Sequence, residues 1–263
     1  FKEFLSLDLT ARNDWSSTLP SKHNSFFYPS VNLGFVISDF ARSVGSGLPA
    51  WITFAKVRLS AAQVGKDPDP YNLYNVRMFE YQMGKRKPIP NTIKMNSDLK
   101  PEIKTSYEVG LDMKFFGNRL GFDFTYYNSN TKNQAMLVDA SAPWTQQWVN
   151  AGRITNKGVE LMVYGTLAQT KDLTFNLSVN FAHNKSIVDE LADGVNRIYF
   201  NGDPNMPVKV GAVSGGKLGD IYANNLMKRD ANGNIIIGAN GLPMTETGNG
   251  NLEQYLLDHP IGN

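Results

Sequence analysis

Residues 105–127 read TSYEVGLDMKFFGNRLGFDFTYY and contain two alternating segments joined by a tight link. In Thr105–Phe115, mostly apolar residues alternate with polar residues or glycine, and the same period of two returns in Leu120–Tyr127. Between them, Phe116-Gly117-Asn118-Arg119 has the residue types of a β-hairpin turn. The stretch therefore predicts two antiparallel strands, each with one apolar and one polar face.

The same alternation recurs in five further segments. They are 4–12, 27–38, 51–62, 159–167 and 173–182. Seven strands of roughly 9–11 residues match the length that a tilted strand needs to cross a membrane. A soluble β-sandwich would also alternate, so periodicity alone leaves the fold class open.

The links between the predicted strands favour a membrane barrel. They are 13–26, 39–50, 63–104, 116–119, 129–158, 168–172 and the residues after 183, so that long links alternate with shorter ones. Outer-membrane barrels have short periplasmic turns and long outer loops, whereas soluble domains rarely carry several long structureless loops at one end. We therefore predict an all-β fold: an antiparallel up-and-down transmembrane β-barrel, present as about seven strands of a larger barrel, with long extracellular loops.

Aromatic residues gather near the predicted strand ends, where a barrel places them at the level of the lipid headgroups. For any single one, packing in a soluble core is an equally good interpretation. The residues are Phe26, Phe27, Tyr28, Trp51, Phe115, Phe116, Tyr126 and Tyr127.

Composition excludes several functional classes. The 263 residues carry 26 Lys and Arg against 24 Asp and Glu, and this near balance gives no sign of a nucleic-acid-binding face. There is no cysteine, which excludes disulfides and thiolate metal sites, and the three histidines are far apart. No stretch approaches the ~18 apolar residues of a membrane helix. We predict no metal site and no cofactor.

Two loop motifs are weak matches to ligand sites. Residues 211–217 have the Gly and Lys spacing of a phosphate-binding loop, but Leu218 stands where Ser or Thr would hold Mg²⁺, so we predict a flexible loop. Residues 230–234 resemble the start of a calcium loop, yet an Asn-Gly turn is the better interpretation, and calcium binding by the loops stays open.

Carboxylates such as Glu108, Asp112, Asp123 and Glu160 lie on polar strand faces together with lysine and arginine. Pairs of carboxylates can act as general acids, but a hydrated lumen lined by mixed charges is the simpler account. No catalytic constellation is recognisable, and we predict that the protein is not an enzyme.

Several motifs in a fixed order resemble the SusC/RagA family of TonB-dependent outer-membrane transporters of Bacteroidetes. The first is Arg12–Pro20, followed by Phe26–Ser30. Further matches are 56–60, 64–67, 99–102, 106–111, 122–127, 150–152, 156–161, 219–222 and 229–234. The resemblance covers nearly the whole chain.

The resemblance implies a large barrel closed by a plug domain, which imports oligosaccharides or peptides across the bacterial outer membrane. It also implies a SusD-like lipoprotein over the outer mouth, TonB as the energy supply, and outer-membrane lipid around the wall. We expect residues 1–192 to form strands with their turns and loops, and 193–263 to form a long extracellular loop region. The plug, the TonB contact and the closing strands are expected to lie outside this sequence.

Five aromatic residues in the predicted loops are candidates for contact with cargo, because an aromatic face can stack on a sugar ring or pack on a peptide. They are Trp15, Tyr71, Tyr74, Trp144 and Trp148. The alternative is that they pack against the lipoprotein or neighbouring loops. For the protein as a whole, a β-rich glycan-binding adhesin and a passive porin remain alternative hypotheses.

Overall fold

The structure, a computed structural model, describes residues 3–192, 194–195, 197–199, 208–223, 226–246 and 255–256. The chain divides into two compact units, Phe1–Ser186 and Ile187–Asn263, and each is described by itself. The first unit is dominated by one large sheet, which sets the position of every candidate site below.

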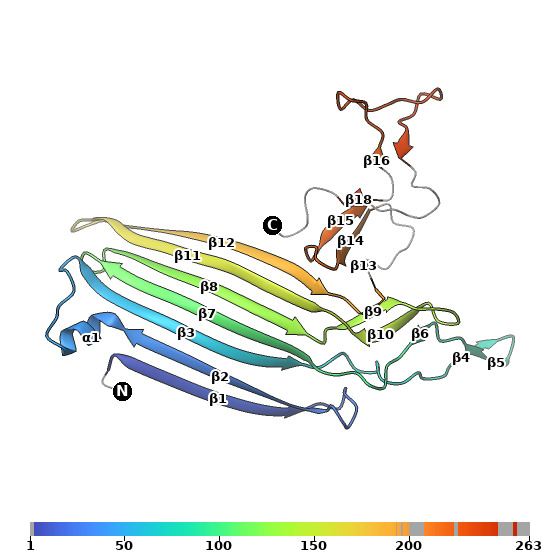
Figure 1. The fold of residues 1–263 in the computed structure, drawn as a ribbon, viewed down its shortest axis with the longest axis horizontal. Helices are drawn as coiled ribbons and strands as arrows, with labels where there is room; N and C mark the ends of the chain where they lie inside the picture. The colour runs from blue at the N-terminus through green and yellow to red at the C-terminus, as the bar shows by residue number, and fades with distance from the viewer. Residues whose placement is uncertain are drawn as a thin grey trace. The chain divides into compact units, whose positions relative to one another are not determined.

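The large sheet has seven long strands that lie side by side in nearly chain order (Figure 1). Their order is β1-β2-β3-β7-β8-β11-β12, and the paired registers show antiparallel neighbours. The prediction of seven antiparallel strands is confirmed. The strands are β1 (Leu5–Trp15), β2 (Ser25–Val36), β3 (Ile52–Lys66), β7 (Glu102–Phe115), β8 (Leu120–Lys132), β11 (Arg153–Gln169) and β12 (Thr174–Glu190).

The register places the apolar residues of successive strands in continuous rows on one face. One row joins Leu7, Leu33, Leu59, Val109, Tyr126 and Val159. Most of these side chains are exposed rather than buried. Leu9, in the next row, is 70% exposed, and four large apolar residues of β12 are exposed as well. A soluble protein rarely exposes an apolar surface of this extent, so the face has the character of a lipid-facing barrel wall.

The connections fall into two groups at opposite ends of the sheet. Residues 16–24, 67–101 and 133–152 join strands at one end, which we call the loop end; 37–51, 116–119 and 170–173 join them at the other, the turn end. The predicted asymmetry holds for the later connections. It is wrong for the first pair, because β1 and β2 extend further than expected and leave only 16–24 between them.

The turn-end connection 37–51 contains a short helix, α1 (Ile37–Ser43), which the sequence did not predict. Ile37 and Ser38 were expected to continue the preceding strand, and that expectation is wrong. Phe40 of α1 packs against the rings of Phe4 and Phe35, with centroids 5.2 and 5.4 Å apart. This aromatic contact, together with the Arg42–Asp39 ion pair, favours the helical turn over continued alternation.

The loop-end connections contain short strands of their own. β4 (Met78–Gln82) pairs with β5 (Lys85–Ile89), and β10 (Gln146–Asn150) pairs with β6 (Ile93–Lys94) and β9 (Ala135–Asp139). Trp148, expected in a loop, therefore lies in a strand.

The aromatic residues near the strand ends divide between the two faces. Trp51, Phe115 and Phe122 stack on the outer face at the turn end, as a headgroup belt requires. Phe26 and Tyr28 lie on the inner face and are buried, and Tyr127 donates from its hydroxyl to Asn184 on the same face. For these three the headgroup prediction is wrong, because alternation turns them away from lipid.

The second unit holds small sheets. β13 (Arg197–Tyr199), β14 (Val208–Val213), β15 (Asp220–Ala223) and β18 (Tyr255–Leu256) form one, and β16 (Leu226–Met227) pairs with β17 (Thr245–Glu246). Over the part of the chain that is described, no helix is long and apolar enough to span a membrane.

Candidate functional site on the inner face and at the loop end

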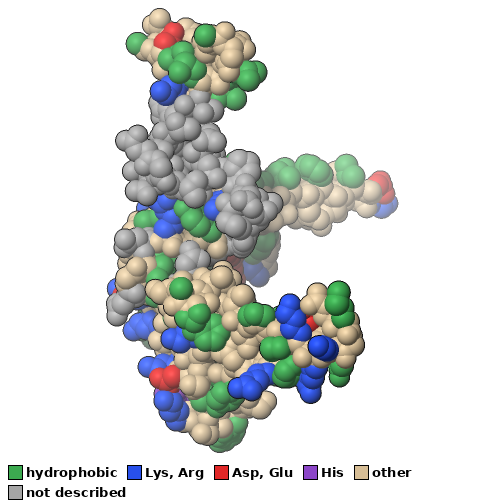
Figure 2. All heavy atoms as spheres, turned by 90° about the vertical axis from the view of Figure 1, so that its right-hand side faces the viewer, with side chains coloured by type: hydrophobic (Ala, Val, Ile, Leu, Met, Phe, Trp, Pro, Cys, Tyr) green, Lys and Arg blue, Asp and Glu red, His purple; other side chains and the backbone are tan. Residues whose placement is uncertain are grey.

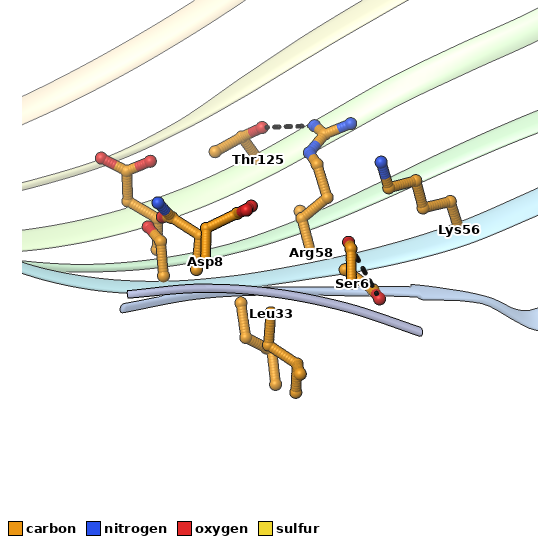
Figure 3. Close-up of a pocket in the computed structure, with 12 residues that line it drawn as sticks. Ser6, Asp8, Leu33, Lys56, Arg58 and Thr125 are labelled. Carbon is orange, nitrogen blue, oxygen red and sulfur yellow. Dashed lines mark hydrogen bonds between the residues drawn. The ribbon is translucent and has the colours of Figure 1, made fainter. Parts of the chain in front are cut away.

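The inner face of the large sheet carries a belt of mixed charge centred on Arg58. This side chain donates to the Asp123 carboxylate at 2.6 Å. It also reaches the Thr125 hydroxyl at 3.5 Å (Figure 3). Lys56 lies opposite Asp112 in the ladder, and Ser60 lies opposite Glu108. These residues form a wall of mixed charge, in which Asp123 is paired with Arg58.

Glycines make room for the long cationic side chains. A Cβ atom on Gly110 would lie 2.9 Å from Nε and Nη2 of Arg58, and one on Gly34 would lie 3.2 Å from Cε of Lys56. Without side chains at these positions, the cations can lie flat across the neighbouring strands. Two of the glycines in the alternating pattern thus have a packing role that the sequence alone did not disclose.

A hollow of about 370 Å³ lies over this belt. Asp8, Lys56, Arg58 and Thr125 project to one side of the sheet, while Leu33 points to the opposite side (Figure 3). A second hollow of about 390 Å³ follows along the inner face, where Lys104, Glu108 and Glu160 are among its lining residues. Both hollows present charged and amide groups, a surface suited to a polar partner rather than to lipid.

A row of small side chains crosses the inner face between the charge belt and the loop end. Its members, paired strand by strand, are Thr10, Ser30, Ala62, Ser106, Ser129 and Asn156. The hydroxyls of Thr10 and Ser30 lie 2.5 Å apart, and Ser186 of the last strand donates to Asn156. Because these side chains are short, another surface can approach the wall closely along this row.

The motif Arg12–Pro20 forms a brace at the loop end. Arg12 donates to the Asp14 carboxylate at 2.7 Å and to the Tyr28 hydroxyl at 2.5 Å, and Tyr28 donates to Asp14. Next to it, Ser16 and Thr18 both donate to the carboxylate of Asp67, which follows β3. The hydrogen bond from Ser16, and to a smaller extent the one from Thr18, lowers the pKa of Asp67. The brace ties the first loop to the beginning of the long β3–β7 connection.

Beneath the brace is a small buried cluster. It comprises Leu19, Phe26, Tyr28 and Leu99, with Leu73 and Trp148 packed against it. Leu99 is fully buried. Residues from three loop-end connections thus pack in one apolar cluster, which holds these connections together at the loop end. Sequence reasoning missed the ties to Asp67 and Leu99, although both lie in motifs quoted for the family resemblance.

The five aromatic candidates have unequal surroundings. Trp15 ends β1 and is 72% exposed, while Tyr71 is 84% exposed and Tyr74 is exposed as well. Trp144 and Trp148 are half-buried, and Trp148 packs against the buried cluster. All five are described, and no ring–ring contact joins any two of them. They stay candidates rather than a formed site.

The two weak loop motifs take the simpler structure. Residues 211–217 end β14 and turn back towards β15 without entering a helix, with Gly215 at a φ of +81°. At 230–234, the Asp230 carboxylate accepts hydrogen bonds from the backbone N–H groups of Asn234 and Asn232, both at 2.9 Å, and these bonds, that of Asn234 first, lower its pKa. Asp230 is thus used in closing an Asn-Gly turn. Among the described residues no group of three or more His, Asp and Glu could hold a metal ion.

The chain is similar in sequence to proteins named as TonB-dependent receptors. The chain is 28% identical over 193 residues to TonB-dependent receptor P3 of Formosa agariphila, covering 70% of this chain and 19% of that protein. It is 26% identical over 204 residues to TonB-dependent receptor SusC of Bacteroides thetaiotaomicron, covering 73% and 20%. The chain thus spans about a fifth of the length of these relatives.

Solved structures agree in fold. The structure of the RagAB peptide transporter superposes with a TM-score of 0.78 at 23% identity, covering 99% of this chain and 29% of that one. The RagAB peptide importer in its closed-closed state gives a TM-score of 0.77 at 22% identity, with the same coverage.

The family model named TonB dependent receptor-like, beta-barrel, matches residues 2–232. It describes a family of outer-membrane receptors and transporters rather than enzymes. The seven-stranded wall, its exposed apolar face and its charged inner face are what such a barrel requires. The chain belongs to the TonB-dependent receptor-like β-barrel family.

Proposed function

We propose that this chain is part of the barrel wall of a SusC-like importer, which moves oligosaccharides or peptides across the outer membrane with energy delivered through TonB. The observation that carries the proposal is the two-faced sheet. Its apolar rows run along one face from β1 to β11, and its other face carries the Arg58 belt. A wall of this kind separates lipid from a polar interior.

The inner face is a seat for a plug domain of the whole protein. The row of small side chains from Thr10 to Asn156 permits close approach, and the charges beside it offer ion pairs and hydrogen bonds. Cargo would then be met mainly at the loop end, above the plug. There the exposed rings of Trp15, Tyr71 and Tyr74 are free to stack on sugars or pack on peptides.

Residues 193–263 belong to the extracellular loop region of the same barrel under this proposal, and a SusD-like lipoprotein covers the mouth. The exposed apolar face argues against the alternative of a soluble glycan-binding adhesin. The passive-porin alternative differs in that uptake through a porin would not need TonB.

The test is to purify the whole receptor from native outer membranes and to identify retained cargo by mass spectrometry. We expect an oligosaccharide or peptide together with a copurifying lipoprotein. Uptake of that cargo by cells should stop when TonB is deleted. Uptake that persists without TonB would favour a porin, and a receptor that carries neither cargo nor lipoprotein would contradict the proposal.

A further inference from the structure

The hairpin formed by β4 and β5 projects from the long β3–β7 connection. Every residue of both strands is exposed, and within the described chain the two form a sheet of their own with no third strand. The side chain of Tyr81 is 78% exposed, and Met83 at the tip is 98% exposed. An isolated two-stranded hairpin is marginally stable in water, so an ordered hairpin with bare edges favours a role in binding.

The turn fixes which backbone groups point outward. Met83 and Gly84 have φ values of +52° and +73°, as in a type I′ turn, and the ladder pairs Gln82 with Lys85. In such a hairpin the pair next to the turn is hydrogen-bonded, and hydrogen-bonded pairs then alternate with pairs whose N–H and C=O groups face away. The outward-facing pairs are therefore Tyr81 with Arg86 and Phe79 with Pro88.

The two edges differ as a result. Pro88 has no N–H, so the outer edge of β5 lacks a donor where a further strand would need one. On β4, both Phe79 and Tyr81 present an N–H and a C=O outward, two residues apart, as a ladder requires. The hairpin thus has one edge open to another strand and one edge that is blunted.

The charges around the open edge select the partner. Residues 77–89 carry four cationic side chains and one carboxylate. The cations are Arg77, Lys85, Arg86 and Lys87, and the carboxylate is that of Glu80, which lies 3.8 Å from the Lys87 ammonium group. Arg86 lies over the Phe79 ring at 3.9 Å, which holds its charge close to β4. In the lower part of Figure 2, Lys and Arg side chains lie next to hydrophobic ones on the surface that faces the viewer. An acidic, extended segment fits this surface best.

We propose that the open edge of β4 receives an extended acidic segment of the capping lipoprotein as an added β-strand. Main-chain hydrogen bonds to Phe79 and Tyr81 supply affinity, and the basic side chains supply selectivity. A lipid headgroup matches the charges but has no ladder of donors and acceptors for the edge. The inference rests on the proposed function, which supplies the lipoprotein.

The first experiment compares Tyr81→Pro with Tyr81→Thr in the whole receptor, purified from outer membranes. Both variants lose the ring, but only proline removes the outward N–H while leaving the bonds inside the hairpin. We expect Tyr81→Pro to retain at least tenfold less lipoprotein per receptor, and Tyr81→Thr to retain nearly the wild-type amount. Equal retention by both variants, or equal loss, would overturn strand addition at this edge.

A second experiment keeps the hairpin intact. A photo-crosslinking phenylalanine analogue in place of Tyr81 should link to an acidic extended segment of the copurified lipoprotein, identified by mass spectrometry. Links to lipopolysaccharide or to the receptor's own loops would overturn the inference.

The double variant Arg77→Glu with Lys85→Glu should weaken lipoprotein retention severalfold, whereas Lys171→Glu at the turn end should not. Import and lipoprotein binding that survive every hairpin variant would leave the proposed function standing and remove this inference. A wild-type receptor that retains cargo but binds no lipoprotein would also remove this inference alone, and one that carries neither would remove both.

Discussion

The two faces of the large sheet are built from the same strands yet follow opposite rules. The outer face repeats similar apolar side chains, as in the row Leu7, Leu33 and Leu59. The inner face instead joins particular residues, as Arg58 with Asp123 and Arg12 with Tyr28. The difference shows that the surroundings of each face decide its side chains. A face in lipid needs only apolar side chains, whereas a face toward polar groups needs a hydrogen-bond or ionic partner for each polar side chain.

The largest expected effect comes from placing a charge on the outer face. Leu59 lies midway along β3, and Leu59→Arg should destabilise the folded receptor by about 2–4 kcal/mol, the cost of Arg near the bilayer midplane. Urea titration of the receptor folded in lipid vesicles measures this loss. Ser60→Arg, one residue along on the inner face, is the matched control and should cost clearly less. Equal costs would mean that the two faces do not differ in solvent.

The next effect separates the two tryptophans at the loop end. Trp148→Ala removes packing from the buried cluster and should cost about 2 kcal/mol in the same titration. Trp15→Ala should stay within about 0.5 kcal/mol, because this side chain is exposed. If Trp15 contacts cargo, its variant should instead release the retained ligand severalfold faster. A Trp15 variant with normal stability and normal retention would remove it from the candidates.

A smaller effect is expected from the charge belt. Arg58→Gln leaves Asp123 without its ion pair, and since both side chains are about one-third exposed, the cost should be about 1 kcal/mol. The double variant Arg58→Gln with Asp123→Asn should recover part of the loss, which a double-mutant cycle measures. Strict additivity of the two substitutions would show that the pair contributes nothing to stability.

The smallest effect concerns pH at the brace. The pKa of Asp67 is lowered by its hydrogen bonds from Ser16 and Thr18, so the stabilisation is present above the ordinary Asp pKa of about 4. It is lost as the pH falls through the lower value in the folded state. Asp67→Asn should therefore cost under about 1 kcal/mol at neutral pH, and this cost should shrink as the pH falls below about 4. Protease cleavage within 67–101, measured against pH, reports the loosening. A wild-type profile that matches that of Asp67→Asn would contradict the linkage.

Much of the wall could be predicted from sequence because alternation is a local signal. Period two located seven strands and assigned residues such as Leu59 and Arg58 to opposite faces. The contacts at the loop end were harder to predict. Ser16 and Asp67 are far apart in the chain and carry no periodic signal, and α1 depends on Phe40 meeting rings from two other segments. The aromatic residues at strand ends divide in the same way. The alternation already places Tyr28 on the polar face opposite Phe27, but its place in a buried cluster with Leu99 depends on a distant segment.

The order β1-β2-β3-β7-β8-β11-β12 also has a consequence for how the wall is assembled. Each strand of the wall pairs with the previous wall strand in the chain, so a growing edge always receives the next segment to arrive, and contact order within the wall stays low. Residues 67–101 connect β3 to β7, and these two strands pair with each other. The connection can therefore change in length or in amino-acid sequence without altering the order in which the wall strands pair. The loop end can thus vary in sequence while the order in which the strands pair is preserved.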